Sequence, residues 1–318
     1  MFKLKNKEFT FTTDVSGLPC GLNGALYFVA MDEDGGKAKH PLSKPGAKYG
    51  MGYCDAQCPH DMKFIEGLAN CEGWKPQDND ENSGNGKYGT CCAEMDIWEA
   101  NSQATAYTVH ACSKTGATKW SGNDCGDDDN RYNGICDKDG CDYNSWRLGN
   151  QTFFGPGLIV DSSKPVTVVT QFITSNNQDS GELVEVRRLY VQNNKVIQNT
   201  VTNIQGIKNA DSITDSFCDD TKSVFGDTND YKAKGAMAGF SKSIDPGVVL
   251  VRSLWDDHSV NMLWLDSTYP TDSNKPGASR GPCAITSGKP SDVESQSASA
   301  SVKFSDIRFG PIDSTYSK

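Results

Sequence analysis

The chain has 318 residues, 36% of them hydrophobic, and a formal net charge of −10 at pH 7. This acidic balance argues against nucleic acid and anionic membranes as partners, because both select for basic surfaces, whereas a neutral polymer is compatible with it. No apolar run approaches the roughly 18 residues of a membrane span, and the N-terminus shows no apolar core of a signal peptide. Pro and Gly are scattered, so we expect a single domain over residues 1–318 with no linker.

The predicted elements are mainly strands. Alternating apolar and polar residues, or β-branched residues, predict strands over residues 8–15, 25–31, 90–98, 165–174, 183–192, 247–255, 260–265 and 301–309. One clear helix is predicted over residues 214–225, with Thr214 as its cap and Gly226 as its stop. Residues 67–88, 113–145 and 199–212 form loops longer than about 12 to 15 residues, a length that usually has a functional reason. Eight strands with covering loops indicate an all-β, two-sheet sandwich.

The segment Glu94-Met-Asp-Ile-Trp-Glu99 places three carboxylates close together. Glu94 and Asp96 are two residues apart, so on a strand both side chains point to one face, whereas on a helix they would diverge. Glu99 follows at an odd step from Glu94 and would point to the other face of a regular strand. We therefore expect a bend or bulge between Asp96 and Glu99, a feature common beside active sites. Paired carboxylates of this kind cleave glycosidic bonds.

The carboxylate spacing alone is not specific, because Asp and Glu make up 41 of the 318 residues. The surrounding run Gly89-Thr-Cys-Cys-Ala-Glu-Met-Asp-Ile-Trp-Glu-Ala-Asn101 alternates acids with large apolar residues, as a strand with an apolar back and an acidic front does. This run resembles the signature of glycoside hydrolase family 7, the retaining cellulases. Further blocks of the same family, in the same order, resemble residues 20–27, 46–58, 253–257, 261–270 and 302–311.

The resemblance implies a concanavalin-like jelly-roll β-sandwich whose long loops cover a substrate cleft or tunnel. It implies hydrolysis of β-1,4-glucosidic bonds in cellulose with retention of configuration and release of cellobiose from chain ends. Two alternatives stay open: an endo-β-1,4-glucanase of the same family, and a non-catalytic, lectin-like carbohydrate-binding domain on the same architecture. The family also carries a further section, roughly a quarter of the catalytic domain, ahead of the position that matches Met1. We find no carbohydrate-binding module in the sequence.

The family's catalytic roles fall on matching residues of this chain. Glu94 resembles the nucleophile, Glu99 the general acid/base, and Asp96 the carboxyl that is hydrogen-bonded to the nucleophile. The alternative for Asp96 is a strand residue that faces solvent. Nearby carboxylates push each other's pKa values apart, which suits one ionised and one protonated member.

Substrate-binding residues are also implied by the resemblance. Aromatic platforms and fixed polar groups bind sugars, and Arg forks grip vicinal hydroxyls. A Trp in a strand or a lone His is more often structural, so these positions depend on the resemblance. The expected residues are Asn23, Tyr27, Tyr53, Asp55, Gln57, His110, Arg131, Asp139, Asp142, Arg147, Trp255, Trp264, Tyr269 and Arg280.

Twelve cysteines indicate an oxidising compartment, although Cys54, Cys58, Cys91 and Cys92 have the residue types of a four-thiolate zinc site. Adjacent strand residues such as Cys91 and Cys92 face opposite ways, which suits two separate disulfides better. The family pattern pairs Cys54 with Cys92, Cys58 with Cys91, Cys20 with Cys283, Cys112 with Cys136, and Cys141 with Cys218. The family commonly has a cysteine at the position of Trp120, as the partner of Cys125, and lacks one at Cys71. The even count favours a pair between Cys71 and Cys125.

The remaining expectations concern location and ligands. We expect a secreted, extracellular monomer whose partners are cellulose or cello-oligosaccharides, with no cofactor and no metal. Residues 137–142 superficially resemble a calcium loop but lack its full pattern with the terminal Glu, so a turn held by disulfides is favoured. The tripeptide Asn150-Gln-Thr152 is a possible glycosylation site.

Overall fold

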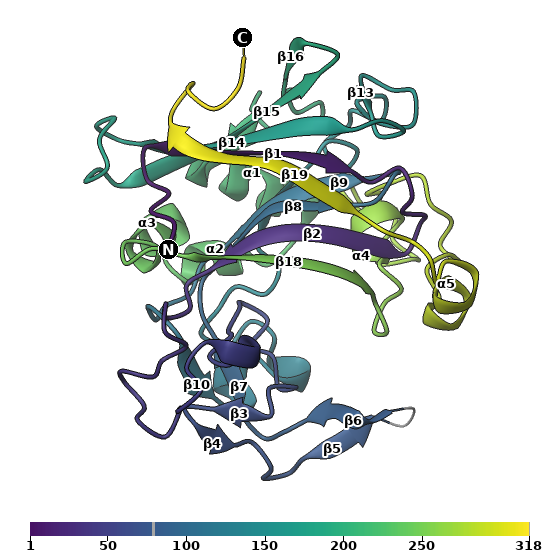
Figure 1. Cartoon of the computed structure of the whole chain (residues 1–318). Coiled ribbons are helices and arrows are strands. Elements are labelled where there is room, and N and C mark those ends of the chain that lie inside the picture. The colour runs from purple at the N-terminus through teal and green to yellow at the C-terminus, as the bar shows by residue number, and fades with distance from the viewer. Residues whose placement is uncertain (78–79, 318) are drawn as a thin grey trace.

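The computed structural model describes residues 1–77 and 80–317 and contains two large antiparallel sheets that lie face to face (Figure 1). The first sheet has the order β16-β15-β14-β1-β19, and β17 pairs with β15. Its strands are β1 (Lys7–Asp14), β14 (Val166–Thr174), β15 (Leu183–Gln192), β16 (Lys195–Gln198), β17 (Ser212–Ile213) and β19 (Lys303–Pro311).

The second sheet has the order β11-β9-β8-β2-β18. Its strands are β2 (Leu22–Val29), β8 (Glu94–Ala100), β9 (Thr105–His110), β11 (Cys141–Asn144) and β18 (Val249–Asp256). Aromatic side chains fill the space between the sheets: the rings of Phe9 and Phe28 lie 5.1 Å apart, and those of Phe11 and Trp98 lie 6.1 Å apart. Alternating strand residues supply this core from both sheets, which confirms the predicted β-sandwich.

Short hairpins and loops cover the side of the second sheet that faces away from the core, at the bottom of Figure 1. They include β3 (Phe64–Ile65), β4 (Leu68–Ala69), β5 (Lys75–Gln77), β6 (Asp80–Asn85), β7 (Gly89–Cys91) and β10 (Thr118–Trp120), with 3₁₀ turns at Lys48–Gly50, Gly122–Cys125 and Asp128–Asn130. A further small pair, β12 (Phe154–Gly155) and β13 (Val160–Asp161), is parallel. These segments include two of the three long loops that the sequence predicted to be functional.

The helices are short and lie outside the sandwich. They are α1 (Asp215–Phe225), α2 (Asp230–Ala233), α3 (Ala236–Ser243), α4 (Leu263–Asp266) and α5 (Pro290–Gln296). Within the described residues, none of them has the length and apolar character required to cross a bilayer. The predicted helix is confirmed as α1: the Thr214 hydroxyl accepts a hydrogen bond from the Phe217 amide at 3.2 Å, and Gly226 ends it with a φ of 73°.

The strand predicted over residues 260–265 is wrong, because this segment contains α4. The carboxylate of Asp257 accepts hydrogen bonds from the amides of Ser259, Val260 and Met262 at 2.8 to 3.3 Å and winds the chain away from the extended conformation. Side-chain acceptors of this kind compete with strand pairing. The apolar alternation in the sequence therefore reflects packing of a turn and a short helix.

All five disulfides that the resemblance implied are confirmed: Cys20–Cys283, Cys54–Cys92, Cys58–Cys91, Cys112–Cys136 and Cys141–Cys218. The pairing of Cys71 with Cys125 is wrong, since both thiols are free in the described chain. Cys71 is exposed beside the β3–β4 hairpin, whereas Cys125 is buried near the sulfurs of the Cys58–Cys91 disulfide.

Candidate active site

The site is built around an irregularity in β8. Its neighbour β2 pairs Tyr27 with Asp96 and Leu26 with Trp98, so Ile97 is an extra residue between two consecutive pairs. On the other side, β9 also shifts register between Asp96 and Glu99. The predicted bulge is therefore confirmed. One extra residue reverses the alternation, so Glu99 shares a face with Glu94 and Asp96 although it lies at an odd step from Glu94.

Glu94 and Asp96 lie buried on this face and contact different partners. Oε2 of Glu94 accepts a hydrogen bond from the Ala56 amide at 3.0 Å. Oδ2 of Asp96 lies 3.0 Å from Nε2 of His110, and Nδ1 of His110 lies 2.7 Å from the carbonyl oxygen of Asp137. A carbonyl accepts only, so Nδ1 carries a proton and the imidazole is fixed with Nε2 toward Asp96.

Glu99 is held by Asn23, a fully buried residue of β2. The Asn23 amide group donates a hydrogen bond from Nδ2 to Oε1 of Glu99 at 3.0 Å. Its Oδ1 accepts a hydrogen bond from the amide of Ala100, also at 3.0 Å. Asn23 thus ties the Glu99 carboxyl to the backbone of its own strand and fixes its orientation.

Burial and mutual repulsion shape the ionisation of the cluster. Burial, with the charges of Asp96 and Asp55, holds the pKa of Glu94 well above its usual value, although the hydrogen bond from Ala56 opposes this. Burial and the charge of Asp96 raise the pKa of Glu99 to about 8. Burial alone would lower the pKa of His110, but its hydrogen bond to Asp96 and the nearby negative charges raise it to about 9. The cluster therefore retains protons at a pH where isolated carboxyls are ionised.

A chain of hydrogen bonds leads from Tyr27, the neighbour of Asp96 in the sheet, to the loop layer. The hydroxyls of Tyr27 and Tyr53 lie 2.8 Å apart, and Tyr53 donates to Asp55 at 2.7 Å. Asp55 also accepts from the Gln57 amide at 2.8 Å, and the Gln57 side chain donates to the Lys138 carbonyl. Burial raises the pKa of Asp55 to about 6. The structure thus brings the predicted residues of this side together beside Glu94.

The predicted arginines occupy two ion-pair clusters. Arg131 is exposed, and its guanidinium contacts Asp139 at 2.6 Å. Arg147 is buried, contacts Asp142 at 2.5 Å, and forms a second ion pair of 2.7 Å with Asp227. Burial alone would raise the pKa of Asp142, but the charges of Arg147 and Arg280 outweigh it and lower that pKa. Asp142 is therefore ionised.

Arg280 lies beside the Arg147 cluster, where burial and the charge of Arg147 lower its pKa to about 10. The isolated bridge between Thr268 and Ser279 holds the two loop segments that carry Tyr269 and Arg280 side by side. At the opposite edge of the sheet, the ring of Trp255 on β18 stacks with that of Trp264, with centroids 6.2 Å apart. Trp255 is 38% exposed, which suits a platform, whereas Trp264 is half-buried and donates from Nε1 to Asp257 at 3.1 Å.

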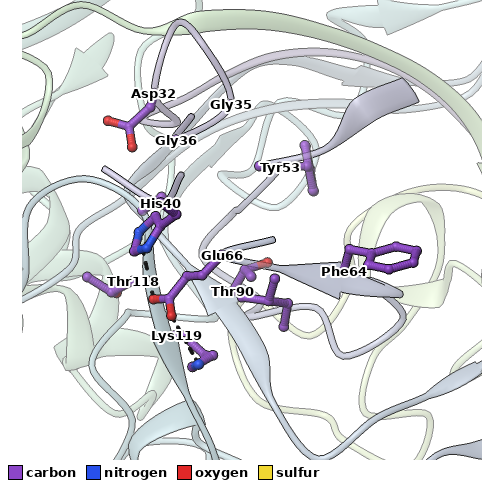
Figure 2. A pocket seen from close by; sticks show the side chains of 13 residues that line it. Asp32, Gly35, Gly36, His40, Tyr53, Phe64, Glu66, Thr90, Thr118 and Lys119 are labelled. Atoms are coloured by element: carbon purple, nitrogen blue, oxygen red, sulfur yellow. Dashed lines mark ion pairs between the residues drawn. The ribbon is translucent and has the colours of Figure 1, made fainter. Parts of the chain in front are cut away.

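A separate small pocket lies in the loop layer (Figure 2). Glu66 lies at its centre, 3.0 Å from Nζ of Lys119 and 4.0 Å from Nε2 of His40. Among the described residues, its lining includes Tyr53 but none of the three clustered carboxylates. The pocket therefore adjoins the site at Tyr53 without including the carboxylates.

One group of the site has the spacing of metal ligands. Oxygen and nitrogen atoms of Glu94, Asp96 and His110 all lie within 4.8 Å of one another. The direct contact between His110 and Asp96 occupies Nε2, the nitrogen that would face an ion. The ion pair between Asp96 and His110 explains this spacing on its own.

Sequence reasoning missed three contacts. Asp227 reaches Arg147 across 80 residues of sequence, and the Asp137 carbonyl reaches His110 across 27. Neither of these two contacts has a local pattern in the sequence that would predict it. Asp257 did carry a signal, since an Asp followed by Ser259 and Asn261 is typical of a turn.

A two-sheet sandwich that carries paired, buried carboxylates on a bulged strand, with an exposed indole beside them, has the site of a glycoside hydrolase. The model of glycosyl hydrolase family 7 matches residues 1–316. The chain is 59% identical over 316 residues to exoglucanase GH7B of Limnoria quadripunctata, covering 99% of this chain and 70% of that protein.

Solved structures agree with the sequence comparison. A GH7 family cellobiohydrolase from Daphnia pulex superimposes with a TM-score of 0.97 at 57% identity, covering 99% of this chain and 72% of that one. A cellobiohydrolase from Melanocarpus albomyces, solved as a complex with cellotetraose, superimposes with a TM-score of 0.93 at 44% identity, with coverages of 99% and 72%. The chain belongs to glycosyl hydrolase family 7.

Proposed function

We propose that this enzyme hydrolyses β-1,4-glucosidic bonds of cellulose with retention of configuration and releases cellobiose from chain ends. The similar proteins support this: one is named an exoglucanase, two are named cellobiohydrolases, and one of these was solved with cellotetraose. The observation that carries the mechanism is the bulge in β8, which puts Glu94 and Glu99 on one face.

In the first step, Glu94 reacts in its ionised form, which the Ala56 amide favours although burial opposes it, and attacks the anomeric carbon while Glu99 gives its proton to the leaving oxygen. The glycosidic bond breaks, and a glycosyl ester forms on Glu94. In the second step, Glu99, now ionised, takes a proton from water, which attacks the same carbon and releases Glu94. The pKa of about 8 for Glu99 suits a group that is protonated at neutral pH and returns to that state after each turnover.

Asp96 and His110 support the nucleophile. A positively charged His110, 3.0 Å from Asp96, compensates the negative charge that Asp96 brings to the cluster. The Ala56 amide favours the ionised form of Glu94 by donating to Oε2.

The remaining residues are proposed to bind sugars. We assign Trp255 as a platform for a glucose ring, since its indole is exposed, and Trp264 as its stacking support. The polar residues of the site are proposed to bind sugar hydroxyls on either side of the carboxylates. These residues are Asn23, Tyr27, Tyr53, Asp55, Gln57, Arg131, Asp139, Asp142, Arg147, Tyr269 and Arg280.

The runner-up is an endoglucanase with the same chemistry. Endoglucanases of 38 to 39% identity are also similar to this chain, but the relatives named exoglucanase or cellobiohydrolase are 44 to 59% identical and favour the chain-end enzyme. The presence of Arg131, Arg147 and Arg280 near one end of the site favours it as well. The two differ in products: a chain-end enzyme yields mainly cellobiose with little loss of viscosity of soluble cellulose, whereas an endoglucanase lowers viscosity at once. A lectin-like role is disfavoured because a domain that only binds sugars has no chemical need for three buried carboxyls.

We further propose that the chain acts as one catalytic domain, as a secreted monomer. Five disulfides in the described chain fit an oxidising compartment. Glycosylation at Asn150 stays a prediction; its Nδ2 donates to the Val201 carbonyl at 2.7 Å, a bond that a glycan on this nitrogen would alter.

The roles of the two glutamates can be separated with leaving groups. Glu99→Gln should lose roughly 10²- to 10⁴-fold on cello-oligosaccharides, the usual contribution of a general acid. On dinitrophenyl cellobioside, whose leaving group needs little protonation, bond cleavage should be nearly normal. Equal loss on both substrates would show that Glu99 is not the acid.

A further inference from the structure

A buried arginine lies between the two sheets, directly behind the catalytic strand. Arg188 is on β15 of the first sheet and is 2% exposed. Its guanidinium carbon lies 4.3 Å from the centre of the Tyr107 ring, on β9. Its Nη2 donates a hydrogen bond to the backbone carbonyl of Ile97. The acceptor belongs to the one residue that forms the bulge of β8.

The bulge needs such a donor. Ile97 has no paired residue in β2 or β9 in the described chain, because the register of both neighbours skips it. A buried carbonyl outside the strand ladder is unfavourable unless a donor reaches it. A slip that removed the bulge would pair Ile97 regularly and turn the Glu99 side chain to the core face. Contact with Arg188 is therefore available only in the register that keeps Glu99 beside Glu94.

A role in stability alone does not account for an arginine here. A buried cation is unfavourable unless it is paired, and the guanidinium of Arg188 contacts a backbone carbonyl through Nη2 and otherwise faces the rings of Tyr107 and Tyr190. Burial correspondingly lowers the pKa of Arg188. An apolar residue of similar volume would fill the same space without this penalty, but it could not donate to Ile97.

We propose that Arg188 is a positioning residue: by holding the Ile97 carbonyl it fixes the bulge in β8 and, through it, the acid/base Glu99 relative to the nucleophile Glu94. This inference rests on the proposed roles of the two glutamates. Glu94 lies before the bulge and is held by Ala56, so its position does not depend on Arg188. Glu99 lies after the bulge and moves with it.

The test compares Arg188→Met, which keeps volume and removes the donors, with Arg188→Lys, which restores one donor. Arg187→Met is the matched control, because Arg187 is the next residue on β15, is half exposed, and pairs with Glu185 at 2.7 Å. For each variant, kcat/KM is measured on a cello-oligosaccharide and on dinitrophenyl cellobioside. The ratio of the two values does not depend on the fraction of protein that is folded.

Arg188→Met should lower kcat/KM for the cello-oligosaccharide at least roughly tenfold more than for the activated substrate, as a displaced general acid would. Arg188→Lys should recover part of the ratio, and Arg187→Met should leave it unchanged. An unchanged ratio in Arg188→Met overturns the inference if Glu99→Gln in parallel shows the leaving-group effect. If Glu99→Gln also lacks that effect, the proposed role of Glu99 fails, and the inference fails with it.

Discussion

Replacing Asn23 by Ala should move the alkaline limit of activity upward. Asn23 donates to Glu99 at 3.0 Å and so favours the ionised form of the acid. A hydrogen bond to a charged group contributes about 1.5 to 3 kcal/mol. One pH unit corresponds to about 1.36 kcal/mol, so loss of this bond should raise the pKa of Glu99 from about 8 by roughly one to two pH units.

The assay is the pH dependence of kcat/KM on a cello-oligosaccharide, since this parameter reports ionisations of the free enzyme. Asn23→Ala will also reduce stability, because the buried amide of Ala100 loses its acceptor. Asn101→Ala is the matched control: Asn101 is equally buried and bonds to Leu22 and Asp266 rather than to Glu99. This control should lose stability while keeping the alkaline limit of the native enzyme.

Two results would refute this reasoning. An alkaline limit that stays in place or falls in Asn23→Ala would mean that the limit does not report Glu99. An equal upward shift in Asn101→Ala would mean that any loss of a buried amide produces it, so the specific hydrogen bond would not be the cause.

Three further predictions concern the carboxylates and the thiols. Glu94→Gln should abolish hydrolysis, because the attacking oxygen is lost. Cello-oligosaccharide binding, measured by calorimetry, should stay within about threefold of the native affinity, because the side-chain shape and an acceptor for the Ala56 amide remain. Loss of binding would indicate a structural role. The buried Glu99 has a folded pKa of about 8 against 4.5 for the free group, so its contribution to stability is complete below about pH 4.5 and is lost as the pH rises through about 8. Chemical denaturation of Glu99→Gln should therefore show a weaker decline in stability between pH 5 and 8 than the native enzyme, and parallel declines would contradict the raised pKa. A thiol reagent should label the exposed Cys71 in the native state and the buried Cys125 only after unfolding, with disulfides kept intact; absence of both labels would mean that the two are paired.

The sequence predicted the sandwich because most of its strands carry their own period of two. The residues of β1, β14 and β15 alternate or are β-branched, and each was placed to within a few residues. The bulge in β8 was also predictable, since only an extra residue brings Glu99 to the face of Glu94.

Other features had no local signal. The strand β9 is buried along its whole length and so lacks the alternation that predicts a strand. The turn before α4 is an exception, because Asp257 marks it in the sequence, but the apolar alternation over residues 260–265 favours a strand. In the sequence, nothing distinguishes Arg188 from its charged neighbour Arg187. Only the packing of the two sheets places Arg188 inside the sandwich and Arg187 outside it. Contacts between residues about 90 positions apart, such as Arg188 and Ile97, depend on the assembled fold.

The central claim, that Glu94 attacks directly and Glu99 supplies the proton, sets the stereochemistry of the first product. Carboxyls placed on one face for direct attack should lie about 5 to 5.5 Å apart, too close for an intervening water. Early-time proton NMR of cello-oligosaccharide hydrolysis measures the outcome before the anomers equilibrate. We predict that the β-anomer appears first. If the α-anomer appears first, the bond is cleaved with inversion, a separation of roughly 6.5 to 9.5 Å is required, and the assignment of Glu94 as nucleophile is wrong.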